Sequence, residues 1–299
     1  MTPSPLSCSI GVFAFNEENN IEKILSALLN QQTNKVNIAE IIVVSSACSD
    51  NTDTIVERIS AEHPIVRLIQ ETERNGKSAS INHFLKETVS DYLVIESADT
   101  IPEKDVIEKL VSPFKCGKVG MTGGRPVPEN DSKSFVGYAV QLLWRMHHKM
   151  AMISPKLGEM VAFKRVFNSI PAESAVDEAS IEALIRENGL KTVYIPDAVI
   201  YNKGPENISD FVKQRRRIEA GHLWLKSQQH YTVASQSSTL LLKITLTELK
   251  ERPQEVFKLM GVMILEMYCR LLGKFDYHVK KKNPFIWDIA KSTKNLDRN

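Results

Sequence analysis

The chain has 299 residues, of which 42% are hydrophobic and 25% are charged, and its formal net charge is +2. Such a chain can form one large or two modest globular domains with a sizeable core. The nearly balanced charge argues against a dedicated nucleic-acid-binding protein. The four scattered cysteines include no CxxC pair, which argues against a zinc site or a disulfide framework. We therefore expect reduced thiols in a cytoplasmic protein.

We expect neither a signal peptide nor a membrane-spanning segment from this sequence. The start, MTPSPLSCSIG, lacks the basic region and apolar run of a signal peptide. The most apolar window, 256–275, is interrupted by charged residues, so it does not predict a membrane span. Residues 253–275 are rich in Met and Leu, and lysines follow at 280–282. This pattern fits either core packing or peripheral contact of C-terminal helices with an anionic membrane surface.

Apolar runs alternate with amphipathic segments over the first hundred residues. Strands are expected at 7–15, 40–46, 66–70 and 91–97, and helices at 20–32, 49–62 and 76–89. This alternation predicts a mostly parallel α/β sheet with helices on both faces. Ligands of such sheets bind beyond the carboxyl ends of the strands, where FNEEN, SSACSDN and VIESADT lie.

The alternation loosens after residue 120. The segment GGRPVPEN, 123–130, has the glycine and proline content of a loop. Further helices are expected at 134–150, 177–189 and 208–226, strands at 158–165 and, as two short pieces, near 192–202, and helices again from about 238. We predict a main domain at 1–230 and a helical C-terminal extension at 231–299.

Seven motifs in chain order carry a family resemblance. They are FNEENNI, IIVVSSACSDNT, RNGKSASIN, VIESADT, GEMVAFKR, VDEASIEAL and QRRRI. Together they resemble the family 2 glycosyltransferases of the GT-A fold, over roughly residues 7–226. The resemblance implies a Rossmann-like GT-A domain with a donor half at about 1–120 and an acceptor half at about 121–230. It further implies a hexosyltransferase of class EC 2.4 that moves a sugar, with inversion, from a nucleotide-diphosphate donor to a carbohydrate or lipid-linked acceptor.

The segment VIESADT resembles the aspartate-x-aspartate motif of that family. Asp99 occupies the position that contacts the metal there, which implies Mg²⁺ or Mn²⁺ as cofactor; such a cation neutralises charge on the diphosphate leaving group. Ser97 stands in place of the first aspartate and could still bond a ribose hydroxyl. Ser45 and Ser46 likewise replace an acid pair of the family. Read without the resemblance, Asp99 could simply be a cap or turn residue.

Asp177 and Glu178 match the acidic motif that opens a helix in the family. The resemblance implies that Glu178 is the general base for the acceptor hydroxyl and that Asp177 is its partner or substitute. An inverting transfer requires such a base, and burial or a neighbouring acid gives a carboxylate the raised basicity required. The simpler alternative is that both acids only complement the dipole of the helix.

The remaining predicted residues bind the donor. They are Glu17, Ser46, Asp50, Arg74, Lys77, Ser97, Gln214 and Arg217. Gln214 and Arg217 share one helix face with Ile218, which replaces the tryptophan of the family's Gln-x-x-Arg-Trp motif. Guanidinium groups suit diphosphate. The alternatives are a solvated helix face for Gln214 and Arg217, surface positions for the loop cations, and a helix cap for Asp50.

Three other functions are compatible with parts of the sequence. A nucleotidyltransferase of related fold would release pyrophosphate, but the glycine-rich signature near the first strand is absent. A binding protein that has lost catalysis is suggested by the acid-to-serine changes, whereas the retained Asp99 and Glu178 argue against it. A dehydrogenase would require a GxGxxG motif after the first strand, and none is present.

Overall fold

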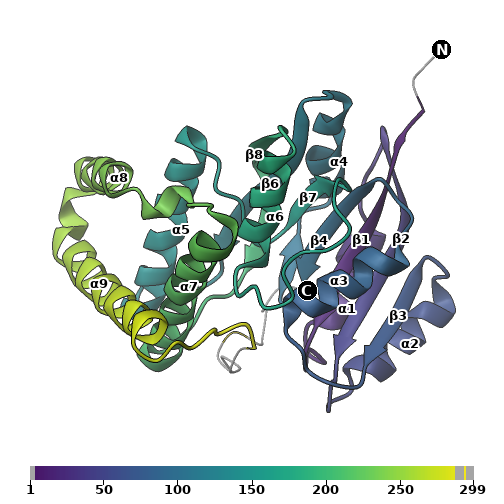
Figure 1. Ribbon diagram of the computed structural model, residues 1–299, viewed down its shortest axis with the longest axis horizontal. Helices are drawn as coiled ribbons and strands as arrows, with labels where there is room; N and C mark the ends of the chain where they lie inside the picture. The colour runs from purple at the N-terminus through teal and green to yellow at the C-terminus, as the bar shows by residue number, and fades with distance from the viewer. Residues whose placement is uncertain (1–3, 287–292, 294–299) are drawn as a thin grey trace.

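The computed structural model describes residues 4–286 and residue 293. Its strands are β1 (Leu6–Ala14), β2 (Val36–Ser46), β3 (Val66–Glu71), β4 (Tyr92–Ser97), β5 (Thr100–Pro102), β6 (Val119–Pro128), β7 (Val161–Lys164) and β8 (Lys191–Asn202). Its α-helices are α1 (Ile21–Leu29), α2 (Thr52–Glu62), α3 (Lys77–Glu87), α4 (Val106–Val111), α5 (Phe135–Ile153), α6 (Asp177–Glu187), α7 (Ile208–Gln229), α8 (Ser238–Glu251) and α9 (Val256–His278). Figure 1 shows a twisted sheet with a group of long helices at one end.

The strands form one sheet in the order β3-β2-β1-β4-β7-β6-β8-β5. The pairs β1–β2, β2–β3, β1–β4 and β6–β8 are parallel. Strand β7 runs antiparallel to β4 and β6, and β5 runs antiparallel to β8. The predicted mostly parallel α/β sheet is therefore confirmed. Because β1, β2 and β4 are parallel, their carboxyl ends lie at one edge, where the three polar motifs were expected to meet.

Alternate side chains of the central strands enter two different cores. In β2, Ile41 and Val43 pack with α1, α2 and α4, whereas Ile42 and Val44 pack with α3 and α6 on the opposite face. This alternation is a consequence of the two-residue period of a strand. Both faces of the sheet are covered, which explains the continuous apolar run in this strand.

Two expectations for the second half were wrong. Most of the segment 123–130 belongs to strand β6, and residues 192–202 lie in the single strand β8. The glycines in β6 serve close packing: a Cβ added to Gly124 would lie 2.5 Å from the carbonyl oxygen of Ala198. A glycine in a strand can mark such a close backbone approach as well as a turn, and the sequence alone did not distinguish the two.

The C-terminal helices form a third core with α5 and α7. Phe211 of α7, Ile244 of α8 and Val262 of α9 are all buried in it. One side of helix α9 is therefore buried against α5, α7 and α8. The boundary near residue 230 stays a prediction, since this core joins helices from both sides of it. In the described part of the chain, no helix has the length and apolar character needed to cross a membrane.

Candidate active site

A cavity of about 740 Å³ lies between the sheet and the C-terminal helices. Its walls come from the ends of β1, β2 and β4 and the starts of α3 and α6 on one side, and from α5, α7 and α9 on the other. All the residues predicted from sequence line it except Asp50: Glu17, Ser46, Arg74, Lys77, Ser97, Asp99, Asp177, Glu178, Gln214 and Arg217. Its size is that of a small-molecule site.

Asp50 does not line this cavity. Its carboxylate accepts hydrogen bonds from the backbone N–H of Thr52 at 3.0 Å and of Glu18 at 3.1 Å. Asp50 thus ties the β2–α2 loop to the β1–α1 loop, whose Phe15 and Glu17 line the cavity. A direct contact of Asp50 with the donor stays a prediction.

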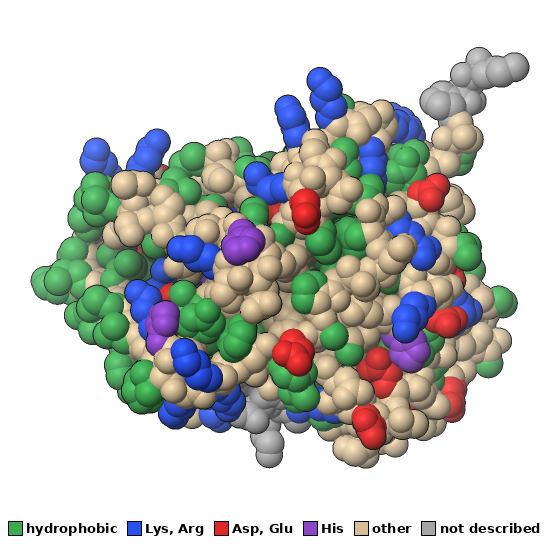
Figure 2. All heavy atoms as spheres, in the orientation of Figure 1, with side chains coloured by type: hydrophobic (Ala, Val, Ile, Leu, Met, Phe, Trp, Pro, Cys, Tyr) green, Lys and Arg blue, Asp and Glu red, His purple; other side chains and the backbone are tan. Residues whose placement is uncertain are grey.

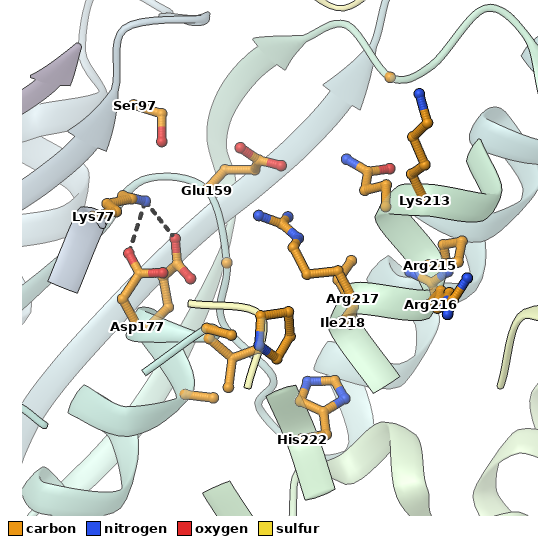
Figure 3. A pocket seen from close by; sticks show the side chains of 18 of the residues that line it. Lys77, Ser97, Glu159, Asp177, Lys213, Arg215, Arg216, Arg217, Ile218 and His222 are labelled. Atoms are coloured by element: carbon orange, nitrogen blue, oxygen red, sulfur yellow. Dashed lines mark hydrogen bonds and ion pairs between the residues drawn. The ribbon is translucent and has the colours of Figure 1, made fainter. Parts of the chain in front are cut away.

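Lys77 holds the two acids at the start of α6. Its Nζ lies 2.8 Å from Asp177 Oδ2 and 3.1 Å from Glu178 Oε1 (Figure 3). The three side chains are only 11%, 3% and 19% exposed, respectively. Lys77 begins α3 directly after Gly76, whose φ of 86° suits glycine. The residue predicted for the donor phosphates therefore also pairs with the predicted base.

The charges of this trio determine its basicity. Burial raises the pKa of Glu178, the adjacent Asp177 raises it further, and Lys77 acts in the opposite direction. Burial lowers the pKa of Lys77, but the two carboxylates more than compensate, so its pKa lies above the ordinary value. Glu178 is thus a carboxylate of raised basicity beside a lysine that stays protonated.

Further carboxylates surround Asp99, which lies in the turn between β4 and β5. Burial raises the pKa of Glu96 to about 8, with contributions from Glu159 and Asp99, and Thr100 Oγ1 donates to Glu96 Oε1 at 2.6 Å. Burial also raises the pKa of Glu159 to about 7, and Asp99 and Glu178 add to this shift. The crowding of these carboxylates favours a bound cation, because a cation stabilises their charged forms.

Glu159 is a site residue that was not predicted from the sequence. It lines the cavity and has a φ of 58°, a left-handed conformation that is uncommon outside glycine. Its Oε1 accepts a hydrogen bond from Asn202 Nδ2 at 3.1 Å. A strained backbone beside a cavity is typical of functional positions. The available signal was an acid between Gly158 and the buried strand β7.

The residues around Asp99 fit one mode of metal binding. No cluster of three His, Cys, Asp or Glu side chains that could hold a metal occurs within residues 4–286 or at 293. Mg²⁺ often takes one or two carboxylates together with substrate phosphates and water, rather than an all-protein site. Asp99, with the charge of Glu159 nearby, fits this shared mode.

Helix α7 presents Gln214, Arg217 and Ile218 to the cavity. Burial lowers the pKa of Arg217 to about 10, while Asp177, Glu178, Glu159 and Asp99 act in the opposite direction. Figure 3 shows Arg217 pointing toward Glu159. Arg217 therefore remains charged among the acids that line the site.

The two neighbouring arginines of α7 also border the cavity, but both pair with acids of α9. Arg215 Nε lies 2.8 Å from Glu266 Oε2, and Arg216 pairs with Asp276. These pairs join α7 to α9. They therefore fix the helix that carries Arg217.

The C-terminal segment after α9 also reaches the cavity. Lys282, Pro284, Phe285 and Ile286 line it. Asn283 Nδ2 donates to the carbonyl oxygen of Glu173 at 2.9 Å, which anchors the segment near α6. Nothing in the sequence predicted this return of the chain to the site.

Known proteins agree with this architecture. Residues 9–172 match the family model described as "Glycosyl transferase family 2". The chain belongs to glycosyltransferase family 2. It is 24% identical over 221 residues to the poly-beta-1,6-N-acetyl-D-glucosamine synthases of Staphylococcus aureus (strain MSSA476) and Staphylococcus epidermidis, covering 70% of this chain and 53% of each relative. The chain thus spans about half the length of these relatives.

Solved structures confirm the GT-A fold of this family member. The mannosyltransferase PcManGT from Pyrobaculum calidifontis, solved in complex with GDP-Man and Mn²⁺, superposes with a TM-score of 0.67 at 19% identity. The match covers 94% of this chain and 89% of that one. S. aureus TarS, residues 1–349, gives a TM-score of 0.50 at 14% identity, covering 88% and 81%. At these identities the likeness concerns the fold alone.

Proposed function

We propose that the protein is an inverting glycosyltransferase that uses a nucleotide-diphosphate sugar together with Mg²⁺ or Mn²⁺. The observation that carries this proposal is the trio Lys77, Asp177 and Glu178, which faces Asp99 and Arg217 in one cavity. A base, a cation site and an arginine are the groups that sugar transfer from a diphosphate requires.

Glu178 takes the proton of the acceptor hydroxyl as its oxygen attacks the anomeric carbon. The raised pKa of Glu178 favours this role, because a stronger base accepts the proton more readily. Lys77 keeps the carboxylate oriented through the 3.1 Å contact and limits the rise in its pKa. Asp177, only 2% exposed, holds Lys77 from the other side.

The donor occupies the edge formed by β1, β2 and β4. Asp99 would hold the cation, which supplies positive charge for the departing diphosphate. Arg217 and Gln214 approach the same diphosphate from α7. Arg74, whose guanidinium stacks 4.0 Å from the centre of the Phe15 ring, borders the nucleotide end with Glu17.

Helix α9 offers a surface for contact with a membrane. Most exposed residues of this helix are apolar: Phe257, Met260, Ile264, Met267, Tyr268, Leu271 and Phe275. The other exposed residues of α9, which is described throughout, are Lys258, Lys274 and His278, and none is an acid. Figure 2 shows hydrophobic side chains gathered over this end of the molecule, with lysines and arginines beside them. Such a face suits an anionic lipid surface.

The donor site is tested by thermal unfolding with UDP, GDP, CDP or dTDP, each with Mn²⁺ or with chelator. A ligand present at 100 times its Kd stabilises the folded state by about 2.7 kcal/mol, which raises Tm by a few degrees. We expect one nucleotide to give this shift only with Mn²⁺. Asp99→Asn should abolish it, and the exposed Asp197→Asn should retain it.

Catalysis is tested separately by release of the nucleoside diphosphate from the matching sugar donor. Glu178→Gln should keep the nucleotide shift and lose turnover. A shift without turnover in the unaltered protein would indicate a binding protein that has lost catalysis. Near-normal turnover of Glu178→Gln would remove this residue from the mechanism.

A further inference from the structure

The cavity extends beyond the donor edge into a second, basic end. Lys156, Arg215, His222 and Arg270 line it there, and we call these four residues the inner basic cluster. They come from the α5–β7 loop, from α7 and from α9. In Figure 3, Arg215 and His222 lie across Arg217 from Ser97. The cluster is therefore separate from the strand ends that receive the donor.

Two acids near the cluster, Glu266 and the buried Glu219 of α7, are fewer than its three cations Lys156, Arg215 and Arg270. Glu266 is shared between Arg215, with its Oε1 2.6 Å from Nη2, and Arg270, with the same oxygen 3.0 Å from Nε. Glu182 also lines this end but pairs with Arg186 at 3.0 Å. Within the described residues, Lys156 has no ion pair of its own. The cluster thus carries excess positive charge.

The cluster is partly shielded from water: the side chains of Arg215 and Arg270 are 21% and 25% exposed. Burial lowers the pKa of Lys156 to about 8, and the nearby Arg215 and Arg270 add to the shift. Burial likewise lowers the pKa of His222 well below its ordinary value, so this imidazole is neutral and can donate one N–H. Desolvated cations of this kind are stabilised by a bound anion.

An apolar part of the same cavity adjoins the cluster. Met146 and Met150 of α5, Leu241 of α8, and Met263 and Met267 of α9 line it. Met267 is also 59% exposed, so the cavity reaches the apolar outer side of α9. A ligand with an anionic group at the cluster could therefore carry an apolar chain toward this surface.

We propose that the inner basic cluster binds a phosphate group of the acceptor. This inference rests on the proposed transferase function, because the acceptor is what must lie on the Glu178 side of the donor. Lys156 supplies the charge that has no paired acid, and Arg215, Arg270 and His222 supply further donors. The phosphate could belong to a lipid or to a soluble sugar phosphate.

The test is a calorimetric titration of hexyl phosphate, inorganic phosphate and 1-hexanol. The donor site is first saturated with the nucleotide and Mn²⁺ that stabilise the protein, so that phosphate cannot bind there. Lys156→Met removes the charge at similar length, and Lys156→Arg restores it. Lys86→Met, at an exposed position on α3 outside the cavity, is the matched control.

We expect hexyl phosphate and inorganic phosphate both to bind. Lys156→Met should weaken the binding of each about tenfold or more, as loss of a charge-assisted hydrogen bond does. Lys156→Arg and Lys86→Met should bind nearly as the unaltered protein does. Binding of hexyl phosphate at least tenfold tighter than inorganic phosphate indicates a lipid phosphate, and equal binding indicates a soluble one. Equal binding of hexanol and hexyl phosphate, or unchanged phosphate binding in Lys156→Met, would overturn the proposal.

Thermal unfolding with nucleotides and the phosphate titration together distinguish a failure of this inference from a failure of the proposed function. If a nucleotide raises Tm but phosphate binding does not depend on Lys156, the acceptor subsite is refuted and the proposed transferase function still stands. If no nucleotide shifts Tm, the titration is run without nucleotide, and Lys156-dependent phosphate binding then refutes the donor assignment and leaves an anion site. Thermal unfolding of Lys156→Met verifies that the variant is folded.

Discussion

Replacing Lys77 by methionine should make the predicted base too basic to act at neutral pH. At 2.8 and 3.1 Å, and with an effective dielectric constant of about 20, Coulomb's law gives about 5–6 kcal/mol of attraction for each pair. Desolvation offsets part of this, and removal of one partner from a buried ion pair costs about 3–5 kcal/mol. If Glu178 bears about 3 kcal/mol of the loss, its pKa rises by about two units.

The assay is the pH dependence of kcat/KM, measured as nucleoside diphosphate release from the sugar donor. This profile reports the pKa of the base in the free enzyme. For Lys77→Met, the fall of kcat/KM on the acid side of the profile, its acid limb, should occur about two pH units higher, and activity should be partly regained at high pH. For Lys77→Arg the acid limb should move much less. An unmoved acid limb in Lys77→Met would refute the coupling between Lys77 and Glu178.

Three further predictions concern stability and the membrane. Gly76→Ala should lower the free energy of unfolding by about 1–3 kcal/mol in urea, because a Cβ at φ 86° would be strained and 2.8 Å from the carbonyl oxygen of Phe285; an unchanged value would mean that this segment yields easily. Glu266→Gln should cost about 3 kcal/mol at pH 7, since the pKa of Glu266 is lowered to about 2 from 4.5. The stability that Glu266 contributes is present above pH 4.5 and is lost as the pH falls toward 2. The difference in the free energy of unfolding between the unaltered protein and Glu266→Gln should therefore become smaller in acid. A difference that does not change with pH would contradict this. Ile264→Asp should reduce sedimentation with anionic vesicles by tenfold or more with Tm unchanged, whereas Val89→Asp, at an exposed site outside α9, should not; equal loss in both would exclude α9 as the contact.

Local pattern was sufficient for elements with a regular apolar spacing or a continuous apolar run. The apolar spacing of α1 and the β-branched run of β2 predicted a helix and a buried strand, and the structure confirms both. The positions of Asp99 after β4 and of Glu178 at the start of α6 also followed from the sequence, because motifs at strand and helix ends are local features. Their chemical roles stay proposals.

The sequence alone therefore determined the order of elements up to β4, the α/β class and the residues at the strand ends, since these depend on periodicity within short segments. The tertiary structure decided which charges meet. Lys77 and Glu178 are 101 residues apart in the chain, and Arg215 pairs with an acid 51 residues away. The glycines of β6 act through backbone contact with β8, and α9 packs one side while exposing the other. Such pairings depend on the packing of distant elements, which no local pattern records.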